Sequence, residues 1–171
     1  MDKRLQKIAL GGGCHWCTEA VFQSLKGVER VEQGYIASTR ANSSFSEGVI
    51  VHFNPELITL AMLIEIHLYT HRSTSAHSFR TKYRSAVYTF SAKKHKEATG
   101  ILLKLQLDFD YQLVTQVLPF SEFKASRESL QDYYFSNPEK PFCERYIEPK
   151  IQLLLDKYRT QVNSDRLSGD Y

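Results

Sequence analysis

A run of three glycines directly in front of a cysteine constrains this chain more than any other stretch. The glycines at 11–13 follow a short apolar run at 8–10, and an amphipathic helical pattern begins at Cys14. A thiol at the point where a strand turns into a helix lies among unpaired backbone N–H groups, which favour the thiolate. The glycines permit positive φ and close backbone approach. We therefore interpret Cys14 as a reactive cysteine; a small buried hydrophobe is the ordinary alternative.

The size and charge of the chain exclude several classes of protein. Its 171 residues suit one domain with a sizeable core. No stretch approaches about 18 consecutive apolar residues, so no transmembrane helix is predicted, and the charged N-terminus lacks the apolar segment of a signal peptide. The net charge of +3, from 22 basic and 19 acidic residues, does not favour nucleic-acid binding. We expect a cytoplasmic monomer with reduced thiols and no membrane partner.

Hydrophobic periodicity and turn residues divide the chain into helices and strands. The predicted strands are 5–10, 28–36, 48–53, 84–90 and 113–118, and the predicted helices are 14–26, 56–68, 92–106, 127–135 and 147–158. Some strands follow one another without a helix between them, which predicts an α+β fold with a mixed sheet and helices packed on it, rather than a doubly wound parallel sheet. We expect one domain over residues 1–158 and a frayed polar tail over residues 159–171.

Five motifs then occur in one order between residues 8 and 150. They are Gly13-Cys14-His15-Trp16-Cys17-Thr18-Glu19-Ala20, Gly34-Tyr35, Ser46-Glu47-Gly48-Val49 before Phe53-Asn54-Pro55, Lys82-Tyr83-Arg84-Ser85-Ala86-Val87-Tyr88, and Asn137-Pro138 before Phe142-Cys143. Together they resemble the A-type peptide methionine sulfoxide reductases. The resemblance implies a two-layer sandwich related to the ferredoxin-like fold, and a reductase of the S-epimer of methionine sulfoxide, free or in proteins. It also implies thioredoxin as the external reductant and no cofactor.

The resemblance assigns roles to five of these residues. Cys14 matches the nucleophile that attacks the sulfoxide sulfur and becomes a sulfenic acid. Glu47 matches the acid, because a sulfoxide oxygen leaves poorly until it is protonated; a solvated glutamate is the alternative. Tyr35 and Tyr83 match the donors to the sulfoxide oxygen, although either tyrosine alone would also suit a core. Trp16 matches a wall of the pocket for the substrate's methyl group, and ordinary helix packing is compatible with that role.

Two departures from the family pattern concern substrate recognition and rate. His15 stands where the family usually has phenylalanine. Its imidazole could pair with the thiolate of Cys14 and lower its pKa, or point away and make the methyl pocket wetter. Ser78 replaces an aspartate that often precedes the tyrosine matched by Tyr83 by five residues. A serine there keeps hydrogen bonding but carries no charge.

Two cysteines are candidates to resolve the sulfenic acid. Cys143 follows Asn137-Pro138 and an aromatic residue, where the family's resolving cysteine commonly lies, and it is our first choice. Cys17 forms a Cys-x-x-Cys motif with Cys14 at the helix start, a spacing that can close a disulfide. We keep Cys17 as a possible relay or bystander.

A metal site is the first rival interpretation. Cys14, Cys17 and His15 could bind a metal together with His71 or His77. The chain lacks the second pair of closely spaced ligands that makes a zinc motif convincing. We therefore predict no metal.

Two further rivals use the same cysteines differently. A thiol–disulfide oxidoreductase would rely on Cys14 and Cys17 and would leave Cys143 dispensable. A non-catalytic relative would bind oxidised methionine without turnover, and His15 and Ser78 are the residues that motivate it. The presence of a nucleophile, an acid and a resolving cysteine together favours the enzyme.

Overall fold

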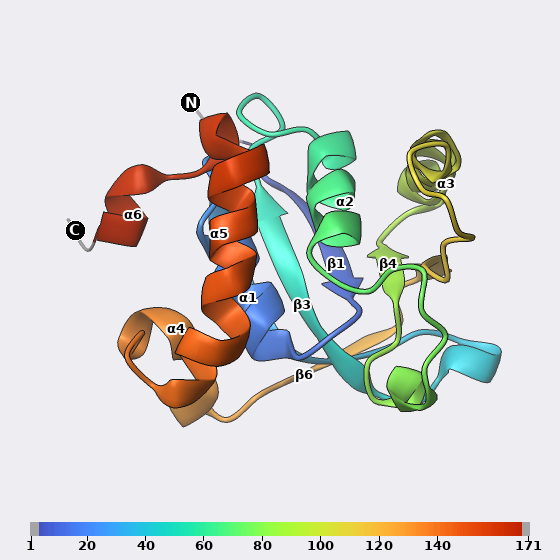
Figure 1. Ribbon diagram of the computed structural model, residues 1–171. Coiled ribbons are helices and arrows are strands. Elements are labelled where there is room, and N and C mark those ends of the chain that lie inside the picture. The colour runs from blue at the N-terminus through green and yellow to red at the C-terminus, as the bar shows by residue number, and fades with distance from the viewer. Residues whose placement is uncertain (1–3, 169–171) are drawn as a thin grey trace.

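The computed structural model describes residues 4–168, and its central element is a six-stranded sheet (Figure 1). The strand order is β5-β4-β1-β3-β2-β6. The strands are β1 (Gln6–Gly11), β2 (Val28–Ala37), β3 (Ser46–Phe53), β4 (Ala86–Thr89), β5 (Gln116–Pro119) and β6 (Glu122–Ala125). Neighbours pair antiparallel except β4 and β5, which are parallel. The prediction of an α+β fold with a mixed sheet is therefore confirmed.

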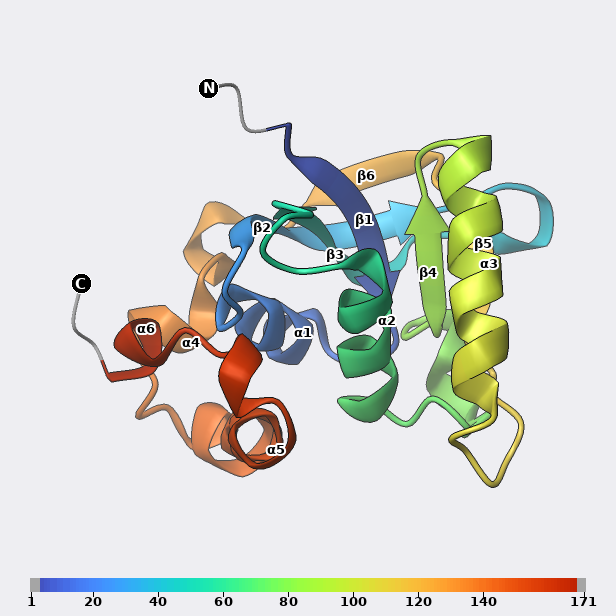
Figure 2. The same cartoon turned by 90° about the horizontal axis from the view of Figure 1, so that it is seen from above.

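Helices cover one face of this sheet. They are α1 (His15–Gln23), α2 (Leu60–Tyr69), α3 (Ala92–Gln106), α4 (Tyr133–Ser136), α5 (Glu148–Lys157) and α6 (Ser164–Ser168). Figures 1 and 2 show α1, α2 and α5 on the same face, with α3 beside β4 and β5. A π-helical turn, η4 (Cys143–Ile147), leads directly into α5. This layering places both candidate resolving segments, the start of α1 and η4, on one side of the sheet.

The alternation of side chains along the strands divides the core in two. Ile8 and Leu10 of β1 belong to the main core under the helices, whereas Ala9 points to a smaller cluster on the opposite face. In β3 Val49 and Val51 likewise join the main core. This is the period of two expected for strands with both faces covered by apolar groups.

Several predicted boundaries differ from the observed ones. The second helix begins four residues later than predicted, because the side chain of Thr59 caps it by accepting from the backbone N–H of Met62 (3.1 Å). The predicted helix 127–135 is interrupted by Asp132, whose φ is +54°, so only α4 and a short 3-10 turn form there. Strand β6 was not predicted, since its four residues are mostly exposed and lie at the sheet edge.

The segment after Tyr158 is also different from the expected frayed tail. Val162 is fully buried and forms a β-bridge with Leu25, and the backbone N–H of Lys26 donates to the carbonyl of Gln161 (2.8 Å). A buried apolar side chain and paired backbone groups hold residues 159–163 against the domain. The ends of the predicted domain and tail, residues 1–3 and 169–171, lie outside the described residues.

Candidate active site

The glycine turn holds Cys14 at the start of α1 through close backbone packing. A Cβ on Gly11 would lie 2.9 Å from the carbonyl oxygen of Glu47, and one on Gly12 would lie 2.4 Å from the His71 ring. Within residues 4–168 the only glycine with positive φ is Gly27, so the expected positive φ does not occur in the turn. Gly11 and Gly12 are needed here because the backbone of β3 and the His71 ring come too close for a side chain, whereas a Cβ on Gly13 would meet no atom within 4 Å.

Cys14 lies at the helix start, where the sequence predicts a reactive thiol. It is half-buried at the N-cap of α1. The S–H of Cys17 donates to its sulfur, and this bond, with a smaller contribution from the backbone N–H of Trp16, lowers the pKa of Cys14 although burial opposes the shift. The same hydrogen bond and burial raise the pKa of Cys17. The lowered pKa favours the thiolate form of Cys14, and the raised pKa keeps Cys17 in its thiol form.

An open cleft of about 940 Å³ lies in front of this thiol. Four of the residues predicted for the site line it, namely Cys14, Cys17, Ser78 and Tyr83. Gly13 and Phe142 of the sequence motifs, and His77 of the rival metal site, also line the cleft. Four further lining residues were not predicted, namely Arg72, Phe79, Tyr146 and Lys150. Phe142 and Tyr146 come from the C-terminal segment, so that segment completes the cleft beside Cys14.

Lys150 is the missed residue with the clearest electrostatic role. Its Nζ donates to the carbonyl of Thr70, and burial lowers the pKa of its ammonium group, while Cys17 and Cys14 act in the opposite direction. The positive charge of Lys150 in turn acts on Cys17, where it partly opposes the rise in pKa caused by the Cys14 hydrogen bond and by burial. The sequence does not indicate this role, because a single lysine on an amphipathic helix looks the same whether it faces solvent or a cleft.

Glu47 is buried and held by His15, so it is not a solvated strand-end glutamate. His15 Nε2 lies 3.1 Å from Glu47 Oε1, and the backbone N–H of His15 approaches the same oxygen at 3.4 Å. The second oxygen, Oε2, lies 3.8 Å from Lys82 Nζ. His15 is 3% exposed and Glu47 is 6% exposed. His15 therefore pairs with the carboxyl group of Glu47 instead of with the thiol of Cys14.

The aromatic residues of the site lie on both sides of His15. The ring of Tyr35 meets His15 edge-on at 5.2 Å, and Tyr35 is the direct cross-strand partner of Glu47. Trp16 stacks on Tyr133 at 4.3 Å and meets Phe142 edge-on at 5.2 Å. Trp16 is thus part of an aromatic wall shared with the C-terminal segment.

The position of Tyr133 depends on a buried glutamate that the sequence did not single out. Glu19 accepts from the backbone N–H groups of Asp132 (2.9 Å) and Tyr133 (3.0 Å) and from Gln33 Nε2 (2.9 Å). Burial raises the pKa of Glu19, while these three donors oppose the shift. Its carboxyl group fixes the start of α4 against α1.

Cys143 lies deeper than the other two cysteines. It is fully buried in η4, its S–H contacts the carbonyl of Asn137 (3.6 Å), and burial raises its pKa. The charge of Cys143 acts on both Cys17 and Tyr133, so its thiol lies near them. All three cysteines are free thiols. The structure therefore brings Cys17 to Cys14 directly, with Cys143 behind.

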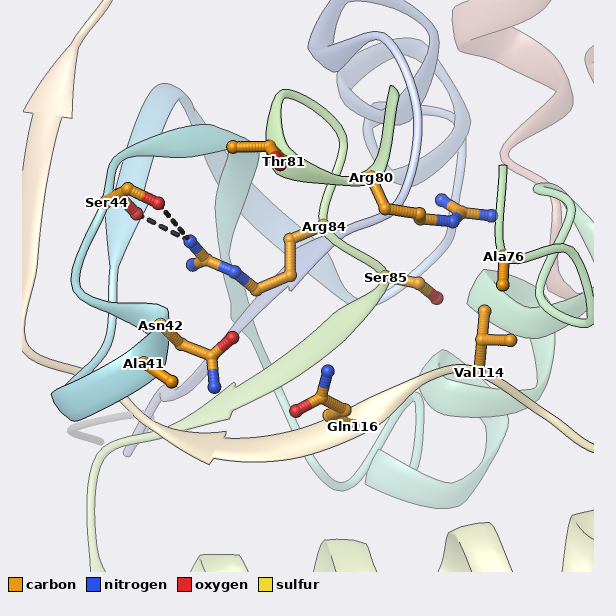
Figure 3. Close-up of a pocket in the computed structure, with 10 residues that line it drawn as sticks. All are labelled: Ala41, Asn42, Ser44, Ala76, Arg80, Thr81, Arg84, Ser85, Val114 and Gln116. Carbon is orange, nitrogen blue, oxygen red and sulfur yellow. Dashed lines mark hydrogen bonds between the residues drawn. The ribbon is translucent and has the colours of Figure 1, made fainter. Parts of the chain in front are cut away.

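A second pocket, of about 340 Å³, is lined by Arg80 and Arg84, whose side chains hold the loops around the glycine turn (Figure 3). Arg80 donates to the carbonyls of Gly12 (2.8 Å) and Tyr83 (2.9 Å). Arg84 donates to Ser44, as the dashed lines in Figure 3 show. These guanidinium groups are engaged by oxygens of the protein itself. We interpret them as braces between the glycine turn and the loops around it.

Metal ligation finds no support in this arrangement. Within residues 4–168 no three His, Cys, Asp or Glu side chains are grouped so that they could hold a metal ion. His71 Nε2 instead contacts Ser85 Oγ (2.8 Å), and His77 Nδ1 accepts from the backbone N–H of Phe79 (3.2 Å). In the same part of the chain, no helix combines the length and apolar character needed to cross a membrane.

The fold places a thiol of lowered pKa at a helix N-terminus beside an open cleft, an arrangement typical of thiol-dependent oxidoreductases. The sequence model of the peptide methionine sulfoxide reductases matches residues 6–163. The chain belongs to this family, and it is an oxidoreductase that acts on methionine sulfoxide.

Individual relatives agree over nearly the whole chain. Peptide methionine sulfoxide reductase MsrA of Trichodesmium erythraeum (strain IMS101) is 33% identical over 176 residues, covering 94% of this chain and 99% of the relative. The MsrA of Psychrobacter sp. (strain PRwf-1) is 32% identical over 170 residues, covering 91% and 97%. The reduced form of Mxr1 from Saccharomyces cerevisiae shares the fold, with a TM-score of 0.74, 24% identity, and coverage of 84% of this chain and 91% of that one.

Proposed function

We propose that this enzyme reduces the S-epimer of methionine sulfoxide, in proteins or as the free amino acid, with thioredoxin as the final reductant. The observation that carries the proposal is the placement of Cys14, whose pKa is lowered and whose side chain lines an open cleft beside Tyr83. Membership of the family supports the substrate class. The chemistry needs no cofactor, because cysteine thiols supply both electrons.

In the first step the Cys14 thiolate attacks the sulfoxide sulfur while Glu47 protonates the sulfoxide oxygen. A bond forms between the sulfur of Cys14 and the substrate sulfur. The protonated oxygen then passes to the sulfur of Cys14 as the substrate S–O bond and the new S–S bond break, so that methionine leaves and Cys14 becomes a sulfenic acid. The sulfoxide sulfur gains two electrons and the sulfur of Cys14 loses two. Tyr35 and Tyr83 are proposed to donate hydrogen bonds to the oxygen, which a neutral phenol can do without adding charge.

Two residues are proposed to contact the rest of the substrate. Trp16 offers an apolar face to the methyl group, supported by its stacking on Tyr133. Ser78 is exposed at the cleft and can hydrogen-bond the substrate's polar atoms. The family resemblance also placed His15 at the pocket for the methyl group. Because His15 pairs with Glu47 instead, we propose that Trp16 alone of these two residues forms the wall of that pocket.

The second stage is proposed to pass through both other cysteines. Cys17, whose S–H already contacts Cys14, attacks the sulfenic acid, forms the Cys14–Cys17 disulfide and releases water. Cys143 then attacks Cys17, giving a Cys17–Cys143 disulfide and restoring the Cys14 thiol. Thioredoxin reduces this second disulfide. Cys143 remains the final resolving cysteine, with Cys17 as the relay.

The reductant and the compartment follow from the same thiol chemistry. Mxr1, which shares this fold at 23% identity with a TM-score of 0.62, has been solved in complex with Trx2. A thioredoxin partner for this chain is our proposal. The cycle starts from free thiols, as all three cysteines are here, and a reducing cytoplasm maintains them.

The test is a single turnover without thioredoxin. Pre-reduced protein is mixed with each separated epimer, methionine is quantified, and disulfides are mapped by mass spectrometry. We expect methionine from the S-epimer alone, a Cys17–Cys143 disulfide in the unmodified protein, and a Cys14–Cys17 disulfide in Cys143→Ser. No methionine from either epimer would refute the function. Turnover of disulfides with Cys143 dispensable would support a thiol–disulfide oxidoreductase instead.

A matched pair of substitutions tests the acid. Glu47→Gln should slow methionine formation by about 10²–10⁴-fold, the usual contribution of a general acid. Glu32→Gln is the control, because Glu32 also pairs with a histidine on the same sheet, His52 Nε2 at 2.7 Å, but on the partly exposed end of the strands. Full activity in Glu47→Gln would remove Glu47 from the mechanism while leaving Cys14 in place.

A further inference from the structure

Both ring nitrogens of His15 face oxygen atoms. Nδ1 lies 2.8 Å from the carbonyl oxygen of Gly34, and Nε2 lies 3.1 Å from Oε1 of Glu47. The imidazole is 3% exposed and the glutamate 6% exposed, so water does not easily replace either partner. The carbonyl of Gly34 can only accept, which fixes the proton of a neutral imidazole on Nδ1.

This geometry determines how many protons the pair carries. With Nδ1–H bound to Gly34, a neutral imidazole presents a bare Nε2 to Glu47, and only a protonated Oε1 can satisfy it. If the imidazole is instead doubly protonated, Nε2–H donates to a Glu47 carboxylate. Both arrangements contain the same number of protons and have no net charge, which suits burial. Removing that proton leaves the lone pair of Nε2 against a carboxylate oxygen.

We propose that His15 is a positioning residue that keeps a transferable proton on Glu47, an inference that rests on the proposed acid role of Glu47. The proton shared by Nε2 and Oε1 is the one that Glu47 gives to the sulfoxide oxygen. The facing lone pairs that remain then take up a proton released by the next Cys14 thiol or by water. Phenylalanine, the usual family residue at this position, has no nitrogen with which to hold it.

The charged and titratable neighbours of the pair bear on when the proton is present. Lys82 Nζ, 3.8 Å from Oε2, favours the carboxylate, but its side chain is 65% exposed, so water weakens the effect. The Cys14 thiolate acts oppositely, because its charge and that of Glu47 repel. Tyr35 contributes a ring edge at 5.2 Å from the imidazole. Lys82 and Cys14 therefore act on the charge of Glu47 in opposite directions.

The first test observes the proton directly in the unaltered protein. Reduced protein with ¹⁵N-labelled histidine is examined by long-range ¹H–¹⁵N NMR, with His15 assigned through its bonded backbone atoms. We expect Nδ1 of His15 to be protonated at neutral pH, and Nε2 to be either protonated or the acceptor of a hydrogen bond, so that its shift differs from that of a free bare nitrogen. A bare Nδ1, or an Nε2 with the shift of a free bare nitrogen, would overturn the inference.

The second test measures coupling between the two residues. His15→Phe, Glu47→Gln and the double variant are compared by single-turnover methionine formation from acid to alkaline pH. We expect His15→Phe to lose about tenfold in rate, mostly on the alkaline side, and to have no further effect once Glu47 is glutamine. His52→Phe is the control, since it breaks the partly exposed His52–Glu32 pair and should leave the profile unchanged.

The outcomes separate this inference from the proposed function. If Glu47→Gln is slow but His15→Phe has an unaltered pH profile and the two effects are additive, His15 only fills space and the inference fails while the acid role stands. If Glu47→Gln is fully active, the acid role itself fails. The NMR experiment on the unaltered protein decides the proton count even if His15→Phe does not fold.

Discussion

The indole ring of Trp16 stacks on the ring of Tyr133, with centroids 4.3 Å apart and planes inclined by 7°. Trp16 belongs to the catalytic helix α1, whereas Tyr133 opens α4, more than a hundred residues further along the chain. Phe142 meets both rings edge-on, at 5.2 Å from Trp16 and 5.9 Å from Tyr133. The wall beside the nucleophile is therefore a product of tertiary packing between the two ends of the chain.

Removing the partner of Trp16 should loosen this wall. We expect Tyr133→Ala to raise the KM for methionine sulfoxide several-fold and to lower the free energy of unfolding by about 1–2 kcal/mol, since an aromatic pair contributes about 0.5–1.5 kcal/mol beyond its buried area. Tyr133→Phe keeps the stacked ring and should behave like the unmodified protein. Steady-state kinetics and urea unfolding measure both quantities. Equal effects of the two substitutions would show that the hydroxyl matters and the stack does not.

The hydrogen bond from Cys17 predicts a change in the reactivity of Cys14. Because that bond is the largest cause of the lowered pKa of Cys14, Cys17→Ala should raise this pKa and reduce the thiolate fraction at neutral pH. Cys17→Ser retains a donor and should shift the pKa less. The measurement is the rate of Cys14 alkylation against pH, followed on its own peptide by mass spectrometry. Identical alkylation profiles in the three proteins would contradict the assignment.

The sequence predicts the position of the nucleophile better than the arrangement around it. The glycine turn and the start of a helix are local features, so the placement of Cys14 follows from residues within a few positions of it. The Ser91 cap of α3 is local in the same sense, and it is observed, with Ser91 Oγ accepting from the N–H of Lys94 at 3.2 Å. In contrast, the pairing of His15 with Glu47 joins residues 32 positions apart.

Long-range neighbours explain most of what the sequence could not predict. Whether His15 faces Cys14 or Glu47 depends on how β3 lies against α1, and no periodicity specifies that. Lys150 lines the cleft only because α5 packs on α1. Val162 looks like part of a polar tail until its burial against Leu25 is seen. Sequence patterns specify element type, whereas these contacts depend on packing between elements.

Lys150 should assist the second stage of the reaction more than the first. Its positive charge opposes the rise in the pKa of Cys17, the proposed relay thiol, that the hydrogen bond to Cys14 and burial cause. We expect Lys150→Met to slow the decay of the Cys14 sulfenic acid several-fold, because less Cys17 is ionised, while methionine formation changes little. Trapping the sulfenic acid with dimedone at successive times measures this decay. Lys150→Arg retains a cation and serves as the control. Unchanged decay in Lys150→Met would show that the cation has only a structural role.

A buried histidine that contacts the glycine turn makes the stability of the protein depend on pH. His67 Nε2 donates to the carbonyl of Gly11 (2.8 Å), and burial lowers the pKa of His67 from 6.5 to about 4. The unfolded chain therefore binds a proton that the folded protein resists, so stability is complete above pH 6.5 and is lost as the pH falls toward 4. The loss amounts to about 3 kcal/mol.

Urea unfolding at a series of pH values tests this coupling. His67→Gln can still donate to Gly11 but does not titrate, so its free energy of unfolding should vary less between pH 6.5 and 4 than that of the unmodified protein. Some dependence should remain, because burial also lowers the pKa of His71, whose ring lies 4.2 Å from that of His67. His52→Phe, which changes a partly exposed histidine, is the control. Parallel pH curves for His67→Gln and the unmodified protein would show that His67 is not the group that resists protonation.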